Sequence, residues 1–131
     1  MILSSESTGL VLLGLAAAAA YAVPAAAASR IAPRGVRFSL LLAWLLHAGV
    51  LMLGLAGEPP RFGFAPALSV TAWLVLTVYA IESRLFPQLQ ARWALAGLGA
   101  FTVLLSLVFP GQTLHVSASP WLPLHWALGI A

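Results

Sequence analysis

The chain has 131 residues, of which 62% are hydrophobic and 7% charged, and its net charge of +3 comes from six basic and three acidic residues. A soluble domain of average composition carries about 25% charged residues, so the composition excludes an ordinary soluble domain and predicts a protein that is solvated by lipid. The chain contains no cysteine, which excludes disulfides, thiolate metal sites and covalent attachment of haem to these residues.

The first predicted element is a spanning helix over residues 9–28, an apolar run rich in leucine and alanine. A helix needs about 20 apolar residues to cross a bilayer, and this run has that length. Pro24 lies near its end, where a kink is tolerated. A cleaved signal peptide is the alternative interpretation. No basic residue precedes Arg30, however, and Glu6 is acidic, so we expect the helix to be retained.

Three further runs predict complete spanning helices, over residues 38–57, 64–81 and 93–109, and the last is ended by Pro110 and Gly111. Residues 121–131 are apolar as well, but at about 1.5 Å each they are too few to cross a core of about 30 Å. The predicted fold is therefore all-α, a single polytopic transmembrane helix bundle with four complete spans and the start of a fifth. We expect residues 1–131 to be the N-terminal part of a longer protein.

The arginines predict the orientation of this bundle. The loops after the second and fourth predicted spans hold a single arginine, Arg61, whereas the loops after the first and third hold five. Arginine-rich loops face the cytoplasm, so we expect the N-terminus outside and the protein in a bacterial inner (plasma) membrane. We interpret the excess of basic residues as this topology signal, and expect a lipid bilayer and no nucleic acid as partner. The five arginines are Arg30, Arg34, Arg37, Arg84 and Arg92.

His47 is the residue most suggestive of chemistry. It lies about ten residues, or roughly 15 Å, from the outer end of the second predicted span, near the bilayer midplane. Ionisable side chains at that depth are functional hypotheses by default, and imidazole is a common ligand of metals and of haem iron. The alternative is a hydrogen bond across helices to a hydroxyl of the third span, and the candidates for that partner are Ser69, Thr71 and Thr77.

Two further histidines follow the fourth predicted span. His125 lies about one turn inside the apolar run 121–131 and is either a second ligand or a polar interfacial residue beside Trp126. His115 lies in a charge-free loop and is either a ligand or a solvated loop residue. We expect no enzyme, because the chain has no aspartate, no phosphate-binding loop, no HExxH motif and only three glutamates in separate loops.

Three segments together resemble a known family. They are AWLLHAGVLMLGL around His47, RFGFAPALSVTAWLVLTVYAIESR in and around the third predicted span, and LHVSASPWLPLHWALGIA with the two later histidines. On these segments the chain resembles the N-terminal half of the cytochrome c assembly family of haem-handling membrane proteins, in its HemX-like and YpjD-like branch related to CcsA and CcmC. Members of this branch have roughly eight spanning helices.

The resemblance implies binding or delivery of haem b, with His47, His125 and His115 at the cofactor and His47 and His125 as ligands of the iron. It implies haem and other cytochrome c assembly proteins as partners. The tryptophan-rich WWD motif of the related branches is absent from these residues, which leaves an accessory or regulatory haem role open. The residues themselves also leave open a non-catalytic membrane scaffold or regulatory subunit without a cofactor. A transporter half is disfavoured because Pro24 and Pro66 lie near span ends.

Overall fold

The computed structural model describes residues 5–27, 29–57, 61–86 and 92–113, together with residues 121, 124 and 128. This part of the chain forms four helices and a pair of two-residue strands. The helices are α1 (Ser5–Ala27), α2 (Pro33–Ala56), α3 (Phe64–Leu85) and α4 (Arg92–Val108). The strands, β1 (Arg61–Phe62) and β2 (Gln112–Thr113), pair antiparallel. The all-helical prediction is confirmed apart from this short pair.

Three of the helices are long and apolar enough to cross a membrane, namely Thr8–Ala27 within α1, all of α2 and all of α3. α2 begins at Pro33 rather than at residue 38, because proline suits the first turn of a helix, where its missing N–H has no intrahelical acceptor. α4 has 17 residues, which gives a length of about 25 Å. The fifth predicted span, residues 121–131, lies outside the described residues except for three positions.

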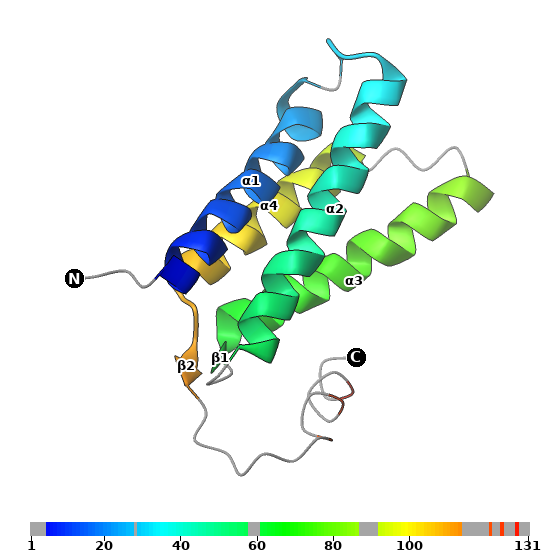
Figure 1. The fold of residues 1–131 in the computed structure, drawn as a ribbon. Helices are drawn as coiled ribbons and strands as arrows, with labels where there is room; N and C mark the ends of the chain where they lie inside the picture. Colours follow the sequence, from blue (N-terminus) through cyan, green and yellow to red (C-terminus); the bar gives the residue numbers. More distant parts are fainter. Residues whose placement is uncertain are drawn as a thin grey trace.

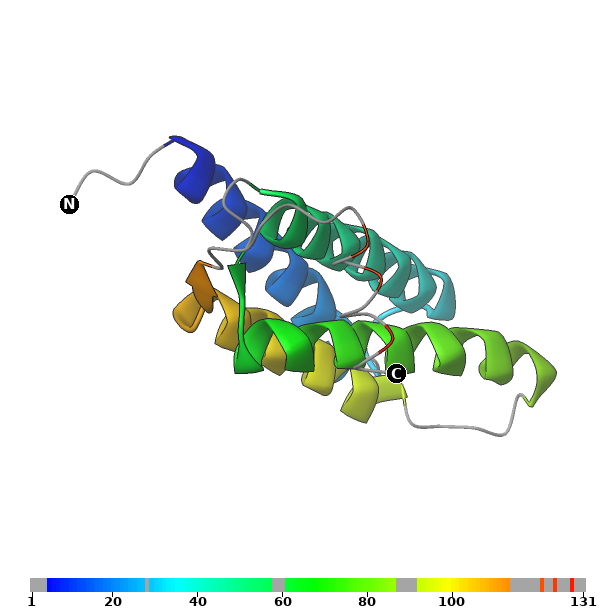
Figure 2. The same cartoon turned by 90° about the horizontal axis from the view of Figure 1, so that it is seen from below.

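The helices alternate in direction and form a bundle (Figure 1). α1 packs closely against both α2 and α4, and α3 packs mainly against α4. α2 and α3 are consecutive in the chain but have much less contact with each other, and Figure 1 shows α3 diverging from α2 toward its C-terminal end. Seen from below, α3 lies beside α4 (Figure 2). We call the sparse contact between α2 and α3 the α2/α3 seam.

The arginines separate between the two ends of the bundle. Arg61 lies in β1, at the end where α2 is followed by α3. The other five lie toward the opposite end (Figure 1), in the α1–α2 connection, the first turns of α2, the last turn of α3 and the first residue of α4. Five of the six arginines therefore lie toward one end of the folded bundle, as the loop counts in the sequence predict.

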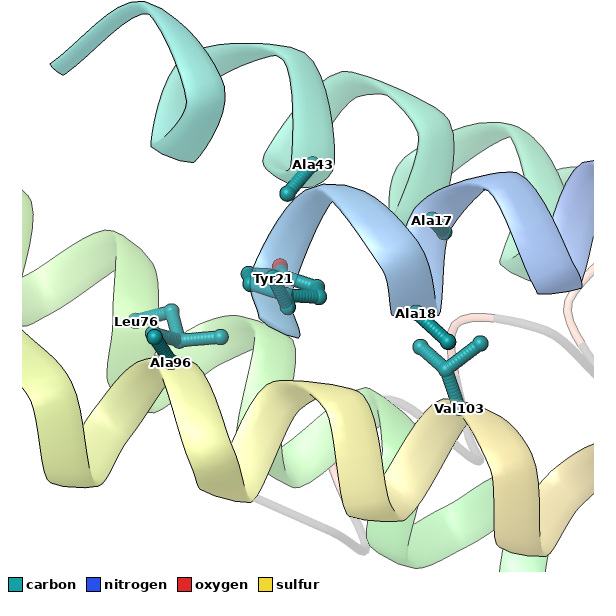
Figure 3. Close-up of a cluster of buried hydrophobic side chains, with 7 residues drawn as sticks. All are labelled: Ala17, Ala18, Tyr21, Ala43, Leu76, Ala96 and Val103. Carbon is teal, nitrogen blue, oxygen red and sulfur yellow. The ribbon is translucent and has the colours of Figure 1, made fainter. Parts of the chain in front are cut away.

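The core is built from small side chains around one large one. Tyr21 of α1 is 1% exposed and lies between the other helices, with Ala43, Leu76 and Ala96 around it (Figure 3). Ala17, Ala18 and Val103 complete the buried cluster along α1 and α4. Small residues allow helix backbones to approach closely, which drives helix association in lipid. The α1–α4 and α1–α2 contacts are close for this reason.

Pro24 lies inside α1 without ending it, because α2 compensates for the missing hydrogen bond. Proline has no N–H, so the carbonyl of Ala20, four residues earlier, loses its helical donor. The Ser39 hydroxyl of α2 donates to this carbonyl, with an Oγ–O distance of 2.6 Å. Neighbouring serines are one of the devices that satisfy such carbonyls inside membranes. The kink tolerance expected for Pro24 therefore depends on a residue of the next helix.

The β1–β2 pair ties the end of α4 to the start of α3. Arg61 pairs with Thr113 and Phe62 with Gln112. Gly111 makes this approach feasible, since its φ of +81° lies in the left-handed region and an added Cβ would collide with the Phe62 carbonyl. The pair places β2 at the end of the bundle at which Arg61 lies.

Candidate functional site

His47 is at the centre of a buried polar cluster that joins three helices. Its Nδ1 is 3.2 Å from the Tyr21 hydroxyl of α1, and its Nε2 is 2.8 Å from the Ser69 hydroxyl of α3. The His47 and Ser69 side chains are both 0% exposed. The Tyr21 ring also meets the imidazole edge-on, with ring centroids 5.7 Å apart and planes at 89°. Both ring nitrogens of the histidine are thus satisfied within the bundle.

The helical period brings these three residues together. His47 lies on the inward face of α2 with Val36, Ala43 and Val50, all of which are buried. Ser69 lies on the inward face of α3, where the other buried residues are Ala65, Ala72 and Leu76. Spacings of three, four and seven residues place such side chains on one side of a helix.

Tyr21 is held in place by its neighbours on two other helices. A Cβ atom added at Gly99 of α4 would be 3.0 Å from the Tyr21 ring and 3.1 Å from Leu76, so the ring fills the space that this glycine leaves. Tyr21 therefore packs against α4 at Gly99, and the Leu76 side chain of α3 belongs to the same buried cluster. The Tyr21 hydroxyl lies 3.2 Å from His47 Nδ1.

Two tryptophans extend this cluster along the α2/α3 seam. Trp44 and Trp73 stack with ring centroids 4.9 Å apart and an angle of 20° between planes. The Trp73 indole donates to the Trp44 carbonyl at 3.2 Å, and the Trp44 indole donates to the Thr77 hydroxyl at 2.8 Å. Long side chains and hydrogen bonds therefore hold α2 and α3 together, in place of the close backbone contact seen between α1 and its neighbours.

The Ser69–His47 contact has the length of a nucleophile–base pair. Both side chains are fully buried, however, and the third partner is a neutral phenol rather than a carboxylate. No substrate carbonyl can reach Ser69 in this arrangement, so the cluster does not have the geometry of a hydrolytic site.

A neutral histidine that ligates a metal through one nitrogen keeps a hydrogen-bond partner on the other, whereas both ring nitrogens of His47 have protein partners in this cluster. The described residues contain no group of three or more metal-ligating side chains, and haem iron needs only one or two axial ligands. In the described arrangement the Nε2 atom of His47 faces Ser69, so ligation there requires Ser69 to give up this contact.

A small cavity lies away from His47, toward the end of the bundle that carries β1. Its volume is about 50 Å³, whereas ligand pockets have volumes of about 300–1,000 Å³. It is too small for a porphyrin and does not include His47. Among the residues that line it are Leu10, Val50, Arg61, Pro66 and Ser106.

Of the three histidines singled out in the sequence, His47 is buried at the meeting point of α1, α2 and α3. His115 and His125 lie outside the described residues. Ser69 is one of the three hydroxyl partners considered for His47, whereas Thr71 and Thr77 bond carbonyls of their own helix. Sequence reasoning missed Tyr21, although a single phenol in an alanine-rich run was a signal that could have found it.

Comparison of the chain with protein-family models, with curated proteins and with solved structures found no match.

Proposed function

We propose that this chain is part of a haem-handling membrane protein of the cytochrome c assembly type. The observation that carries the proposal is a buried imidazole in an apolar bundle, with the Tyr21 hydroxyl at Nδ1 and the Ser69 hydroxyl at Nε2. An apolar environment of this kind excludes water and tunes the reduction potential of a bound metal centre. The resemblance of three sequence segments to that family, one of which contains His47, is the second support for this proposal.

The ligand set follows from the histidines. His47 would hold haem b iron from within the bundle, and His125, with His115, would hold it from the segment that follows β2. Haem supplies an iron centre that accepts imidazole ligands and exchanges one electron. The chain supplies a buried imidazole in an apolar bundle, and a porphyrin at its Nε2 would have to displace Ser69, because the cavity of about 50 Å³ does not reach His47. Other cytochrome c assembly proteins are the expected partners.

The experiment is the absorption spectrum of the protein purified in detergent, oxidised and reduced, with a pyridine haemochrome assay. We expect a stoichiometric b-type spectrum with bis-histidine character. His47→Ala should abolish or shift that spectrum, and His47→Gln, which keeps a polar group at the same place, controls for loss of folding. A flat spectrum, even after haem is added back, would contradict the proposed function.

The membrane arrangement is part of the same proposal. We place α1, α2, α3 and α4 across a bacterial inner membrane as four complete spans, followed by the start of a fifth at residues 121–131. The N-terminus, β1 and β2 then face outward. The separation of Arg61 from the other five arginines supports this orientation, because arginine-rich ends remain in the cytoplasm.

A second candidate function is a non-catalytic membrane scaffold or regulatory subunit without a cofactor. The observation in its favour is that both nitrogens of His47 already have protein partners, so the residue is satisfied as a packing element. On this interpretation the cluster fixes the rotation of three helices. Unchanged haem binding by His47 variants would remove this residue from the site. The absence of haem binding in the unaltered protein would favour the scaffold.

A further inference from the structure

Two arginines flank the α2/α3 seam at the same depth. The Trp44 indole of α2 donates to the Thr77 hydroxyl of α3, so these two residues mark the sides on which the helices face each other. Arg37 lies seven residues before Trp44, and Arg84 lies seven residues after Thr77. Seven residues are two helical turns, or about 10.5 Å, and return to the same side of a helix. Because α2 and α3 run in opposite directions, both arginines lie toward the same end of the seam (Figure 1).

The surface between these arginines and the bond from Trp44 to Thr77 is apolar and exposed. Leu41, three residues before Trp44, is 57% exposed, and Ile81, four residues after Thr77, is 60% exposed. Spacings of three and four residues put both side chains on the seam side of their helices. Toward this end α3 diverges from α2 (Figure 1), so neither side chain is covered by the opposite helix.

The guanidinium groups at this end have no carboxylate partner in the part of the chain that the structure describes. Arg34, Arg37 and Arg84 are exposed, and none forms an ion pair with a described residue. Glu82 is two residues from Arg84, a spacing at which helical side chains do not face each other. Arg84 complements the dipole of α3, but Arg34 and Arg37 are at the positive end of α2, which has no acidic residue in its first turn. The protein therefore leaves the charge of the two α2 arginines uncompensated.

Exposed apolar side chains next to unpaired guanidinium groups match one class of molecule. An anionic phospholipid has a phosphate, which pairs with arginine through charge-assisted hydrogen bonds, and acyl chains, which cover apolar side chains. Basic sites between spanning helices bind headgroups of this kind. An apolar helix in the same place would cover Leu41 and Ile81 but leave the arginines without an anion.

We infer that the arginine end of the α2/α3 seam is a binding site for one anionic phospholipid. Its phosphate pairs with Arg37 and Arg84, and an acyl chain lies against Leu41 and Ile81. Arg34, one turn before Arg37, adds to the positive charge at the headgroup. The bound lipid joins the two helices at the end where they have little contact of their own. This inference needs only α2 and α3 to span a membrane and does not rest on haem binding.

The test is a titration of the detergent-purified chain with dioleoyl phosphatidylglycerol or dioleoyl phosphatidylcholine, followed by native mass spectrometry. We expect a complex with one phosphatidylglycerol, and weaker binding of phosphatidylcholine, which has no net charge. An arginine near an anionic headgroup strengthens binding about fivefold, so Arg37→Gln and Arg84→Gln should each weaken phosphatidylglycerol binding by about that factor. Arg61→Gln is the matched control, because it removes the same charge at the opposite end of the bundle.

A second pair of variants tests the acyl chain. Leu41→Trp places a bulkier side chain on the seam side of α2 and should weaken phosphatidylglycerol binding without changing the charge. Leu42→Trp is its control, because the neighbouring leucine is also exposed, at 41%, but adjacent residues of a helix do not share a face. The thermal unfolding midpoint in lipid-free detergent should be unchanged in all of these variants, and phosphatidylglycerol should raise it in the unaltered chain.

The outcomes that overturn the inference are distinct. Equal binding of the two lipids would remove the role of charge. Equal losses in Arg37→Gln and Arg61→Gln, or in Leu41→Trp and Leu42→Trp, would show that binding does not take place at the seam. Displacement of phosphatidylglycerol by an equal concentration of inorganic phosphate would show a simple anion site instead of a lipid site. None of these results bears on haem binding, which the spectrum of the unaltered chain decides.

Discussion

Ser39 shows how much one hydroxyl contributes when its acceptor has no other donor. In water, a carbonyl opposite a helical proline is satisfied by solvent, but the hydrocarbon core offers none. The Ala20 carbonyl is accordingly bonded by Ser39 from α2, at 2.6 Å. The same logic applies at His47, where two hydroxyls satisfy two ring nitrogens. At the residue scale, hydroxyls of neighbouring helices bond the groups that have no partner within their own helix, namely the Ala20 carbonyl and the two ring nitrogens of His47.

Ser39→Ala is predicted to lower the free energy of unfolding by about 1 kcal/mol, the range found for hydrogen bonds between membrane helices. The measurement is equilibrium unfolding in mixed micelles. In a Pro24→Ala background the same change should cost less, because residue 24 then supplies an N–H to the Ala20 carbonyl. Equal losses in the two backgrounds would show that Ser39 acts elsewhere. Ser106→Ala is a further control, because the Ser106 hydroxyl donates to the Val103 carbonyl of its own helix.

The β1–β2 pair shows how few residues can fix the relation between elements. Two residues on each side join the end of α4 to the start of α3. The join depends on Gly111, whose positive φ and close approach to the Phe62 carbonyl exclude a side chain. At the element scale, this pair places the end of α4 beside the start of α3.

Gly111→Ala is therefore predicted to destabilise the protein by about 1–3 kcal/mol, the range for a strained backbone conformation. Thermal unfolding in detergent measures this loss. Gly97→Ala, in the middle of α4, is the matched control, because nothing lies within 4 Å of its added Cβ. That variant should be neutral or slightly stabilising, since alanine is the better helix former. Similar losses in the two variants would contradict the role assigned to Gly111.

The sequence alone predicted the helices better than their contacts. Runs of apolar residues placed α1, α3 and α4 closely, because hydropathy alone selects a spanning segment. The extension of α2 to Pro33 was missed, because Arg34 and Arg37 interrupt the apolar run. His47 was singled out because an ionisable residue is conspicuous in such a run. Its partner Tyr21 was not, because the rotation of α1 against α2 depends on packing between small residues rather than on any periodic signal.

The whole molecule has a directional charge pattern that fits one orientation in a membrane. Arg61 is at one end of the bundle, and the other five arginines are at the opposite end. The distance between these ends corresponds to helices of 17 to 24 residues, or about 25–36 Å, which matches a hydrocarbon core of about 30 Å. The bundle therefore has the length and the polarity of a membrane-spanning unit.

The proposed orientation is testable because the chain has no cysteine of its own. Single substitutions Arg61→Cys and Arg34→Cys put one thiol at an exposed position at each end. A membrane-impermeant maleimide applied to intact cells should label Arg61→Cys, and should label Arg34→Cys only after lysis. The reverse pattern would contradict an outward-facing N-terminus. Labelling of both variants after lysis confirms that each thiol is reactive.

The Ser39–Ala20 hydrogen bond has a consequence for how the chain enters the membrane. If α1 inserted alone, the carbonyl opposite Pro24 would face hydrocarbon without a donor until α2 arrived. Insertion of α1 and α2 together, as a helical hairpin, avoids that intermediate. The connection between them, near Arg30, is short enough for such concerted entry. A proline in the first helix thus couples the biogenesis of one span to the next.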